Sequence, residues 1–283
     1  MMEPDRIAII LRALVYVGAV AAAGGVLFSL SFPSARQHVE RAVERQVLLG
    51  CWLLILLEPL RYIAFQLAVA EGDWSAAFAP GMRWMGLQTA VGQAAAMRVL
   101  AALALVGTRL RWSGVSLAAA IVMIASFALE GHTVSSHYRL AVAPLLLIHF
   151  AAVCWWFGAL YPLLASIRRA PPEIVAGTAR SFGRRAVWVV GALVAAGAVL
   201  LIVLCNGELR LDKPYQQRFI VKLALVAVLL SLAAWNKLRL TPLLVENYTI
   251  GAAKLRRSIR FEIAVALMIL LSTAWIVSTG PSD

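Results

Sequence analysis

The sequence has 283 residues, of which 62% are hydrophobic and 14% charged, and its mean hydropathy is +0.83. Soluble globular domains are typically about 45–50% apolar and about 25% charged, so the composition excludes an ordinary soluble fold and indicates a bilayer protein. The net charge of +12 does not point to nucleic acid as a partner. The basic residues lie in short loops between apolar runs, as they do in the cytoplasmic loops of membrane proteins.

Apolar runs follow one another along the chain. A spanning helix needs about 20 mostly apolar residues, and about eight runs meet this requirement. The predicted fold class is therefore all-α, a polytopic bundle of about eight transmembrane helices. The predicted spans are Ile7–Leu30, Gln46–Ala68, Leu87–Gly107, Gly114–Thr133, Leu140–Ala165, Arg185–Cys205, Phe219–Trp235 and Ile259–Thr279.

The Lys and Arg residues of the connecting loops predict the orientation of the bundle. Most of them lie in the first, third, fifth and seventh loops. Basic loops face the cytoplasm, so we expect both termini to be periplasmic, in a bacterial inner membrane. We expect no cleavable signal peptide and no extramembrane domain. The chain is predicted to form a single integral membrane domain, with three spans in 7–107 and five in 114–279.

Ionisable side chains inside the predicted spans are costly and usually face the interior of a bundle or a water-filled path. Glu58 and Arg61 are three residues apart, so they can share a helix face and pair. Arg98, in the next span, is an alternative partner for Glu58. Two interpretations stay open for these residues: a buried ion pair that fixes helix packing, or the charged lining of a pathway.

Three of the four histidines lie around one predicted helical hairpin. His132 and His137 flank the external loop after the fourth span, and His149 lies in the fifth span, about 13 Å below its start at 1.5 Å per residue. Antiparallel helices joined by a short loop are neighbours, so the imidazoles can converge. Imidazole suits copper, zinc, iron and nickel. Met123 and Glu130 are candidates for a further ligand or for support of the ligands.

Short motifs mark the hairpin and the C-terminal half. Trp156 follows His149 by two helical turns, and Gly158 lets a neighbouring helix approach closely. The motifs are Gly131-His132, His149, Trp156, Gly158 and Leu160, then Arg180-Ser181-Phe182, Tyr215, Lys222, Asn236 and Pro242, and finally the stretch 255–262, which ends on Glu262. In this order they resemble the CopD family of bacterial copper-resistance membrane proteins, over roughly residues 130–279.

The resemblance implies an inner-membrane protein that handles copper and moves it from periplasm to cytoplasm. It makes His132 and His149 candidate copper ligands and adds His137 as a third. Other residues line a pathway or pack the helices: Trp156, Glu58, Arg98, Lys222, Asn236 and Glu262. Besides the lipid bilayer, the resemblance implies a separate periplasmic copper-binding donor protein as partner, because the sequence shows no fused copper domain and no Met-rich external loop.

Two other functions stay open on the sequence alone. Histidines from different helices can ligate a haem axially, so His132 and His149 also fit a bis-histidine membrane electron-transfer protein. Alternatively, the histidines pack helices in a structural or assembly protein without metal chemistry. An enzyme is not expected, because the sequence has no nucleophile motif, no phosphate-binding loop and no H-E-x-x-H.

Overall fold

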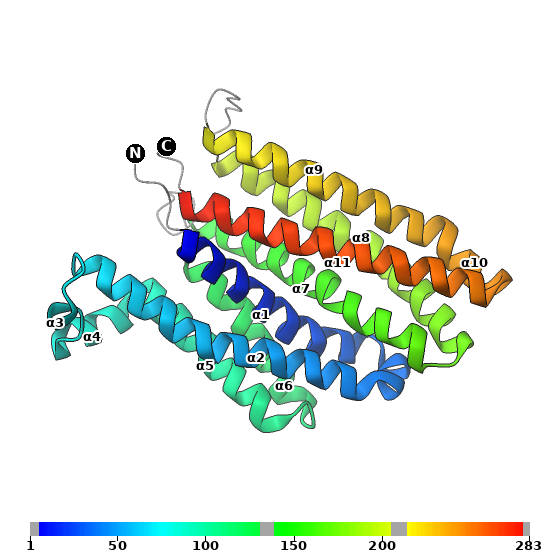
Figure 1. Cartoon of the computed structure of the whole chain (residues 1–283), viewed down its shortest axis with the longest axis horizontal. Helices are drawn as coiled ribbons and strands as arrows, with labels where there is room; N and C mark the ends of the chain where they lie inside the picture. Colours follow the sequence, from blue (N-terminus) through cyan, green and yellow to red (C-terminus); the bar gives the residue numbers. More distant parts are fainter. Residues whose placement is uncertain (1–5, 131–138, 205–213, 280–283) are drawn as a thin grey trace.

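The computed structural model describes residues 6–130, 139–204 and 214–279, and these residues are almost entirely helical, without a strand. Figure 1 shows them as an elongated bundle. The elements are α1 (Arg6–Ser31), α2 (Pro33–Val69), α3 (Trp74–Ala77), α4 (Pro80–Gln88), α5 (Ala90–Thr108), α6 (Ser113–Ser126), the 3-10 turn η1 (Phe127–Leu129), α7 (Arg139–Arg169), α8 (Pro172–Leu204), α9 (Pro214–Trp235), the π-helix η2 (Asn236–Leu240), α10 (Thr241–Glu246) and α11 (Tyr248–Thr279).

Seven segments in the described part of the chain are long and apolar enough to cross a membrane. They belong to α1, α2, α5, α7, α8, the run from α9 to α10, and α11. The eighth predicted span, Gly114–Thr133, corresponds to a shorter apolar segment, Ser113–Leu129, formed by α6 and η1. Its last three residues lie outside the described residues. The prediction of an all-α polytopic bundle is confirmed.

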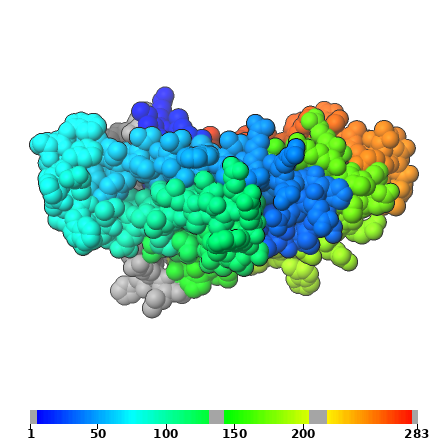
Figure 2. Space-filling model, turned by 90° about the horizontal axis from the view of Figure 1, so that it is seen from below, coloured from blue at the N-terminus to red at the C-terminus, as the bar shows by residue number. Residues whose placement is uncertain are grey.

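The long helices run side by side and reverse direction at each connection (Figure 1). As a result, the start of α1 and the end of α11 lie at one end of the bundle, and the connections that carry most of the basic residues lie at the other. The short helices α3 and α4 form one tip of the molecule and α10 the opposite tip (Figure 2).

Helix α1 is central, because it packs against α2, α6, α7 and α11. Its buried residues are mostly Ala and Gly, which let backbones approach closely in a membrane. Gly24 faces Gly158 of α7 so closely that a Cβ on either glycine would collide with the backbone of the other. Gln46 of α2 closes the contact, since its Nε2 donates to the carbonyls of Ala21 (3.0 Å) and Gly158 (2.9 Å). The close approach predicted at Gly158 is confirmed.

A cluster of aromatic and polar contacts holds the turn between α1 and α2. Arg185 of α8 donates to the Ser31 carbonyl at 2.6 Å, and its guanidinium lies 5.1 Å from the centre of the Phe32 ring. Trp155 of α7 donates to the Ser31 hydroxyl at 3.0 Å and stacks on Phe182 with ring centres 5.1 Å apart. The first connection is therefore fastened to α7 and α8.

Several helices continue beyond the predicted spans at the basic end of the bundle. Helix α2 covers 37 residues with a kink at Val39, and the part after the kink corresponds to about 45 Å at 1.5 Å per residue, against a hydrocarbon thickness of about 30 Å. It begins at Pro33 rather than at Gln46, and α8 and α11 begin at Pro172 and Tyr248. Charged turns remain helical once their side chains reach water, so hydropathy marks the part of a helix in lipid and not its ends.

The run from α9 to α10 contains a turn of π-helix, η2. The backbone N–H of Thr241 donates to the carbonyl of Asn236, five residues back, and the Thr241 hydroxyl donates to the same oxygen at 2.9 Å. Pro242 follows directly and has no N–H to donate. A wide turn of this kind is rare and often lies at a functional site. Here it fixes the backbone of Asn236, whose side chain lines a cavity between the C-terminal helices.

Candidate functional site

The predicted site residues separate into three places in the bundle. Glu58, Arg98 and Glu130 belong to one ion-pair network between α2, α5 and the end of η1. His149 faces α8, and Trp156, Asn236 and Glu262 line a cavity between the C-terminal helices. The remaining two predicted ligands, His132 and His137, lie outside the described residues.

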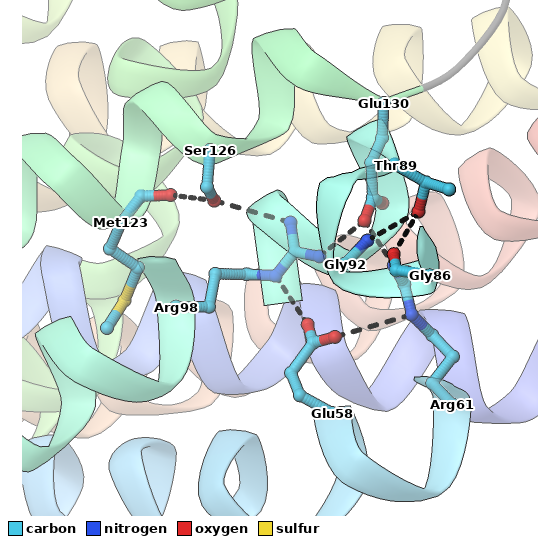
Figure 3. A network of polar contacts seen from close by, with 9 residues as sticks. All are labelled: Glu58, Arg61, Gly86, Thr89, Gly92, Arg98, Met123, Ser126 and Glu130. Carbon is cyan, nitrogen blue, oxygen red and sulfur yellow. Dashed lines mark hydrogen bonds and ion pairs between the residues drawn. The ribbon is translucent and has the colours of Figure 1, made fainter. Parts of the chain in front are cut away.

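The network is built on Glu58 of α2, a fully buried carboxylate (Figure 3). Its Oε1 accepts from Nε of Arg98, which reaches across from α5 and is also fully buried. Its Oε2 lies 3.4 Å from Nε of Arg61, one turn along the same helix. Both pairings considered from the sequence are therefore present together, within α2 and between α2 and α5.

Glu130 is the second carboxylate of the network. Its Oε1 accepts from Nη2 of Arg98 at 2.6 Å and from Nη2 of Arg61 (Figure 3). Ser126 of α6 accepts from Nη1 of Arg98 at 3.3 Å and donates to the Met123 carbonyl at 2.7 Å. The guanidinium of Arg98 is therefore held on all sides by carboxylates and a hydroxyl from three helices.

The network is balanced in charge. Two carboxylates, Glu58 and Glu130, face two guanidiniums, Arg61 and Arg98, and a buried charge is tolerated only when it is paired and hydrogen-bonded in this way. Glu130 directly precedes Gly131-His132 in sequence. The arrangement can therefore anchor the start of the segment that carries His132 onto α2 and α5.

Met123, a predicted additional ligand, belongs to the hydrophobic core of the bundle. Its side chain is fully buried in α6 and is part of a cluster with Phe127. The centre of the Phe127 ring lies 4.7 Å from Cζ of Arg98. This cation–π contact adds to the network. The Met123 side chain thus packs in the core, while its backbone carbonyl accepts from Ser126 in the network.

His149 lies inside the bundle, on the face of α7 that packs against α8. Its Nδ1 lies 3.2 Å from the carbonyl oxygen of Leu193, and a Cβ on Gly197 would lie 3.1 Å from its Cε1. Because a carbonyl only accepts, Nδ1 is the protonated nitrogen and Nε2 carries the lone pair. Lys222 of α9 lies within electrostatic range of the same ring. This is the orientation that a metal-binding imidazole takes when a carbonyl fixes its other nitrogen.

Two helical turns beyond His149, about 10 Å along α7, Trp156 lines a cavity of about 70 Å³. The side chain of Trp156 is 2% exposed. The polar residues of the cavity wall come from four elements: Ser166 of α7, Asn236 and Lys237 of η2, Thr241 of α10 and Glu262 of α11. His149 and this cavity therefore lie along one face of α7.

No group of three or more His, Cys, Asp or Glu side chains comes together as a metal site within residues 6–130, 139–204 and 214–279. His149 contributes one donor in this part of the chain. Any further imidazole donor on the hairpin would come from His132 or His137, outside these ranges.

Two stretches of the sequence match known protein families. Residues 1–138 match the Copper resistance protein D-like N-terminal domain, and residues 176–276 match Copper resistance protein D. The chain belongs to the copper resistance protein D family. No curated protein and no solved structure matches the sequence.

Membership of the copper resistance protein D family, together with the candidate spans, makes this a multi-pass protein of the inner membrane that serves in copper resistance. The two matches cover different parts of the site. Glu58, Arg98 and Glu130 lie in the N-terminal match, and Lys222, Asn236 and Glu262 lie in the C-terminal match. The N-terminal match extends the resemblance to the first 110 residues, where motifs had not revealed it.

Two features of the site were missed from the sequence. The first is the ion pairing of Glu130, although the signal was present: Glu58 alone cannot neutralise both Arg61 and Arg98, so a second acid was required. The second is the cavity around Glu262. Its residues come from segments far apart in the chain, and no sequence spacing reveals a cavity of this kind.

Proposed function

We propose that the protein moves copper from the periplasm to the cytoplasm, with His132 and His149 as ligands and His137 as a third. Family membership supports copper as the cargo. The observation that carries the proposal is the orientation of His149, whose Nδ1 is occupied by the Leu193 carbonyl at 3.2 Å. This leaves Nε2 as the donor atom within the membrane-spanning bundle.

The proposed route begins on the segment after Glu130 and continues down α7. His132 receives copper near the outer end, and His149 takes it over within the bundle. Because a bare cation is far too costly in hydrocarbon, imidazoles must replace its lost water. From His149 the common face of α7 leads to Trp156 and the polar cavity beyond it.

The proposal includes an orientation and a partner. The basic end of the bundle faces the cytoplasm, in line with the positive-inside rule, and both termini face the periplasm. A separate periplasmic copper-binding protein delivers the metal to the outer end. Reporter fusions active only in the periplasm should give signal at the C-terminus and none in the connection between α7 and α8. The opposite pattern would overturn the direction of transport.

The test of the ligands uses copper binding to the purified protein and copper uptake into proteoliposomes. His149→Ala and His132→Ala should each weaken copper binding by at least about tenfold, since loss of a hydrogen bond to a ligand alone costs about 10–100-fold. The matched control is His38→Ala, because His38 is half-buried on α2 and its Nδ1 lies 3.1 Å from the Ser34 carbonyl oxygen of its own helix.

Binding and uptake equal to wild type in His149→Ala would refute the ligand assignment. The same preparations distinguish the haem alternative. A bis-histidine haem protein has a Soret band that disappears in both His132→Ala and His149→Ala, whereas a copper transporter purifies without one. Copper content and copper tolerance unchanged in cells that lack the protein would favour a purely structural role.

A further inference from the structure

Glu262 is a carboxyl group enclosed within the C-terminal helices. It lies on α11, is 3% exposed, and lines the cavity of about 70 Å³ together with Asn236. Trp156 and Ser166 of α7 form the opposite wall. The proposed copper route leads from His149 to this cavity and assigns no role to Glu262.

Glu262 forms no ion pair with any described residue, which sets it apart from the other acids buried in the bundle. Glu58 and Glu130 are each held by two arginines. An ionised carboxylate without a partner is costly in a low-dielectric interior, where such a group takes up a proton or binds a cation. The lack of a guanidinium therefore favours the neutral acid at this position.

Asn236 supplies the second, independent observation. It is 9% exposed and lines the same cavity, with its side-chain amide beside the Glu262 carboxyl. Its Oδ1, however, is buried and accepts no hydrogen bond from the residues that the structure describes. An ionised carboxylate only accepts hydrogen bonds, whereas a protonated one carries an O–H donor. A carboxylic acid and an amide can form two reciprocal hydrogen bonds, so one proton on Glu262 supplies the donor that Asn236 lacks.

The backbone holds Asn236 in this position. It is the first residue of η2, and its carbonyl accepts both the N–H and the hydroxyl of Thr241. Turns of π-helix are found mostly at functional sites. The wide turn therefore fixes the backbone from which the Asn236 side chain reaches the cavity.

The charges around Glu262 leave its carboxyl unpaired. Lys237 of η2 is the other titratable side chain among the described residues that line the cavity, and it is exposed, with its stem against Gly183. Helices α8 and α9 line the cavity with uncharged residues such as Ala179 and Ala233.

None of the other charged residues described on the helices packed against α11 lines the cavity. Arg168 and Arg169 of α7 and Arg239 of η2 are exposed. Arg6 and Arg12 lie in the first turns of α1, far from the basic end of the bundle. Glu246 of α10 lines a separate groove at the surface, together with Lys254 and Arg257 of α11. Lys222 of α9 lies within electrostatic range of His149 of α7, and neither residue lines the cavity.

We propose that Glu262 and Asn236 form a proton-binding site inside the membrane-spanning bundle. One proton from water in the cavity adds to a Glu262 oxygen, and the new O–H donates to Oδ1 of Asn236. Release of the proton to water restores the carboxylate. The cavity of about 70 Å³ has room for more than one water molecule, since about 10–15 Å³ measured in this way suffices for one. The site does not depend on the copper route.

The test is infrared spectroscopy of the purified full-length protein without copper, recorded as a difference between acidic and alkaline pH. We expect the C=O stretch of one protonated, buried carboxyl, shifted when H₂O is replaced by D₂O. Glu262→Gln should abolish this band. Glu173→Gln is the matched control, because Glu173 is exposed in the first turn of α8, and it should leave the band unchanged.

Asn236→Leu provides a second variant that keeps the carboxyl and removes its partner. The band should persist and move to higher wavenumber, because the acid loses its hydrogen bonds. A wild-type spectrum without such a band, or a band that survives in Glu262→Gln, would overturn the proposal. A band that does not move in Asn236→Leu would refute the pairing with Asn236. If Glu262→Gln fails to fold, the wild type and Asn236→Leu still decide, since a missing band in the former or an unmoved band in the latter counts against the proposal.

Discussion

Arg98→Met removes the central cation of the network and retains most of the volume of the side chain. The variant leaves fully buried Glu58 with Nε of Arg61 at 3.4 Å as its remaining cation. It also removes one of the two guanidiniums on Glu130 and the bond to Ser126. Removal of one partner of a buried pair costs about 3–5 kcal/mol, and we expect a loss of stability in this range.

Unfolding in detergent micelles, followed by circular dichroism against denaturant, measures the loss. Arg109→Met is the matched control, because the Arg109 side chain is 61% exposed and its Nε lies 3.8 Å from Oε1 of Glu44. Such a surface pair contributes at most about 1 kcal/mol. The double variant Arg98→Met, Glu58→Gln should recover most of the loss, since Arg61 and Glu130 then remain as a neutral pair.

Two results would refute this reasoning. One is a loss below about 1 kcal/mol in Arg98→Met, which would mean that the Glu58 carboxylate is solvated or protonated without Arg98. The other is a double variant that is as unstable as the single one. In that case the cost would come from packing and not from an uncompensated charge.

Two further predictions concern glycines at helix contacts. Gly197→Ala places a Cβ 3.1 Å from Cε1 of His149, so it should displace the imidazole and weaken copper binding in an equilibrium titration. Gly191→Ala, on the same helix with open space around it, should bind like wild type, and equal affinities in both would contradict the role of the α8 contact. Gly158→Ala should lower the free energy of unfolding by about 1–3 kcal/mol, because the added Cβ would collide with the backbone of Gly24. Gly177→Ala has open space and should instead stabilise by up to about 1 kcal/mol; a change of the same sign in both would argue against close α1–α7 packing.

Hydropathy and charge predicted the spans because the bilayer imposes a length and a polarity on every helix that crosses it. The same signals did not predict where the helices end. Pro33, Pro172 and Tyr248 begin helices well before the apolar runs, because intrahelical hydrogen bonds do not require lipid. Among the predicted spans, within the described residues, the segment Ser113–Leu129 is the one shorter than a full crossing.

The site residues were predicted unevenly for a physical reason. Glu58 and Arg61 lie one turn apart, so their pairing follows from helix periodicity. Glu130 joins them from a distant part of the chain, which only charge balance could have suggested. The contact between Asn236 and Glu262 depends on the π-turn η2. The polar residues Asn236, Lys237 and Arg239 of that turn predict the end of a span, and they give no sign of a π-helix. Local sequence thus indicates which polar groups are buried but not which of them meet.

The central position of α1 bears on how the protein is made. The ribosome releases α1 first and α11 last, and domains synthesised from the N-terminus usually begin to fold before the chain is finished. Here the innermost helix keeps one face without its protein neighbour until the final helix has entered the membrane, because α11 packs directly on α1. Helix α1 is therefore synthesised first, but its burial is completed only when α11 packs on it. A nascent chain stopped before α11 leaves that face of α1 covered only by lipid or by the insertion machinery.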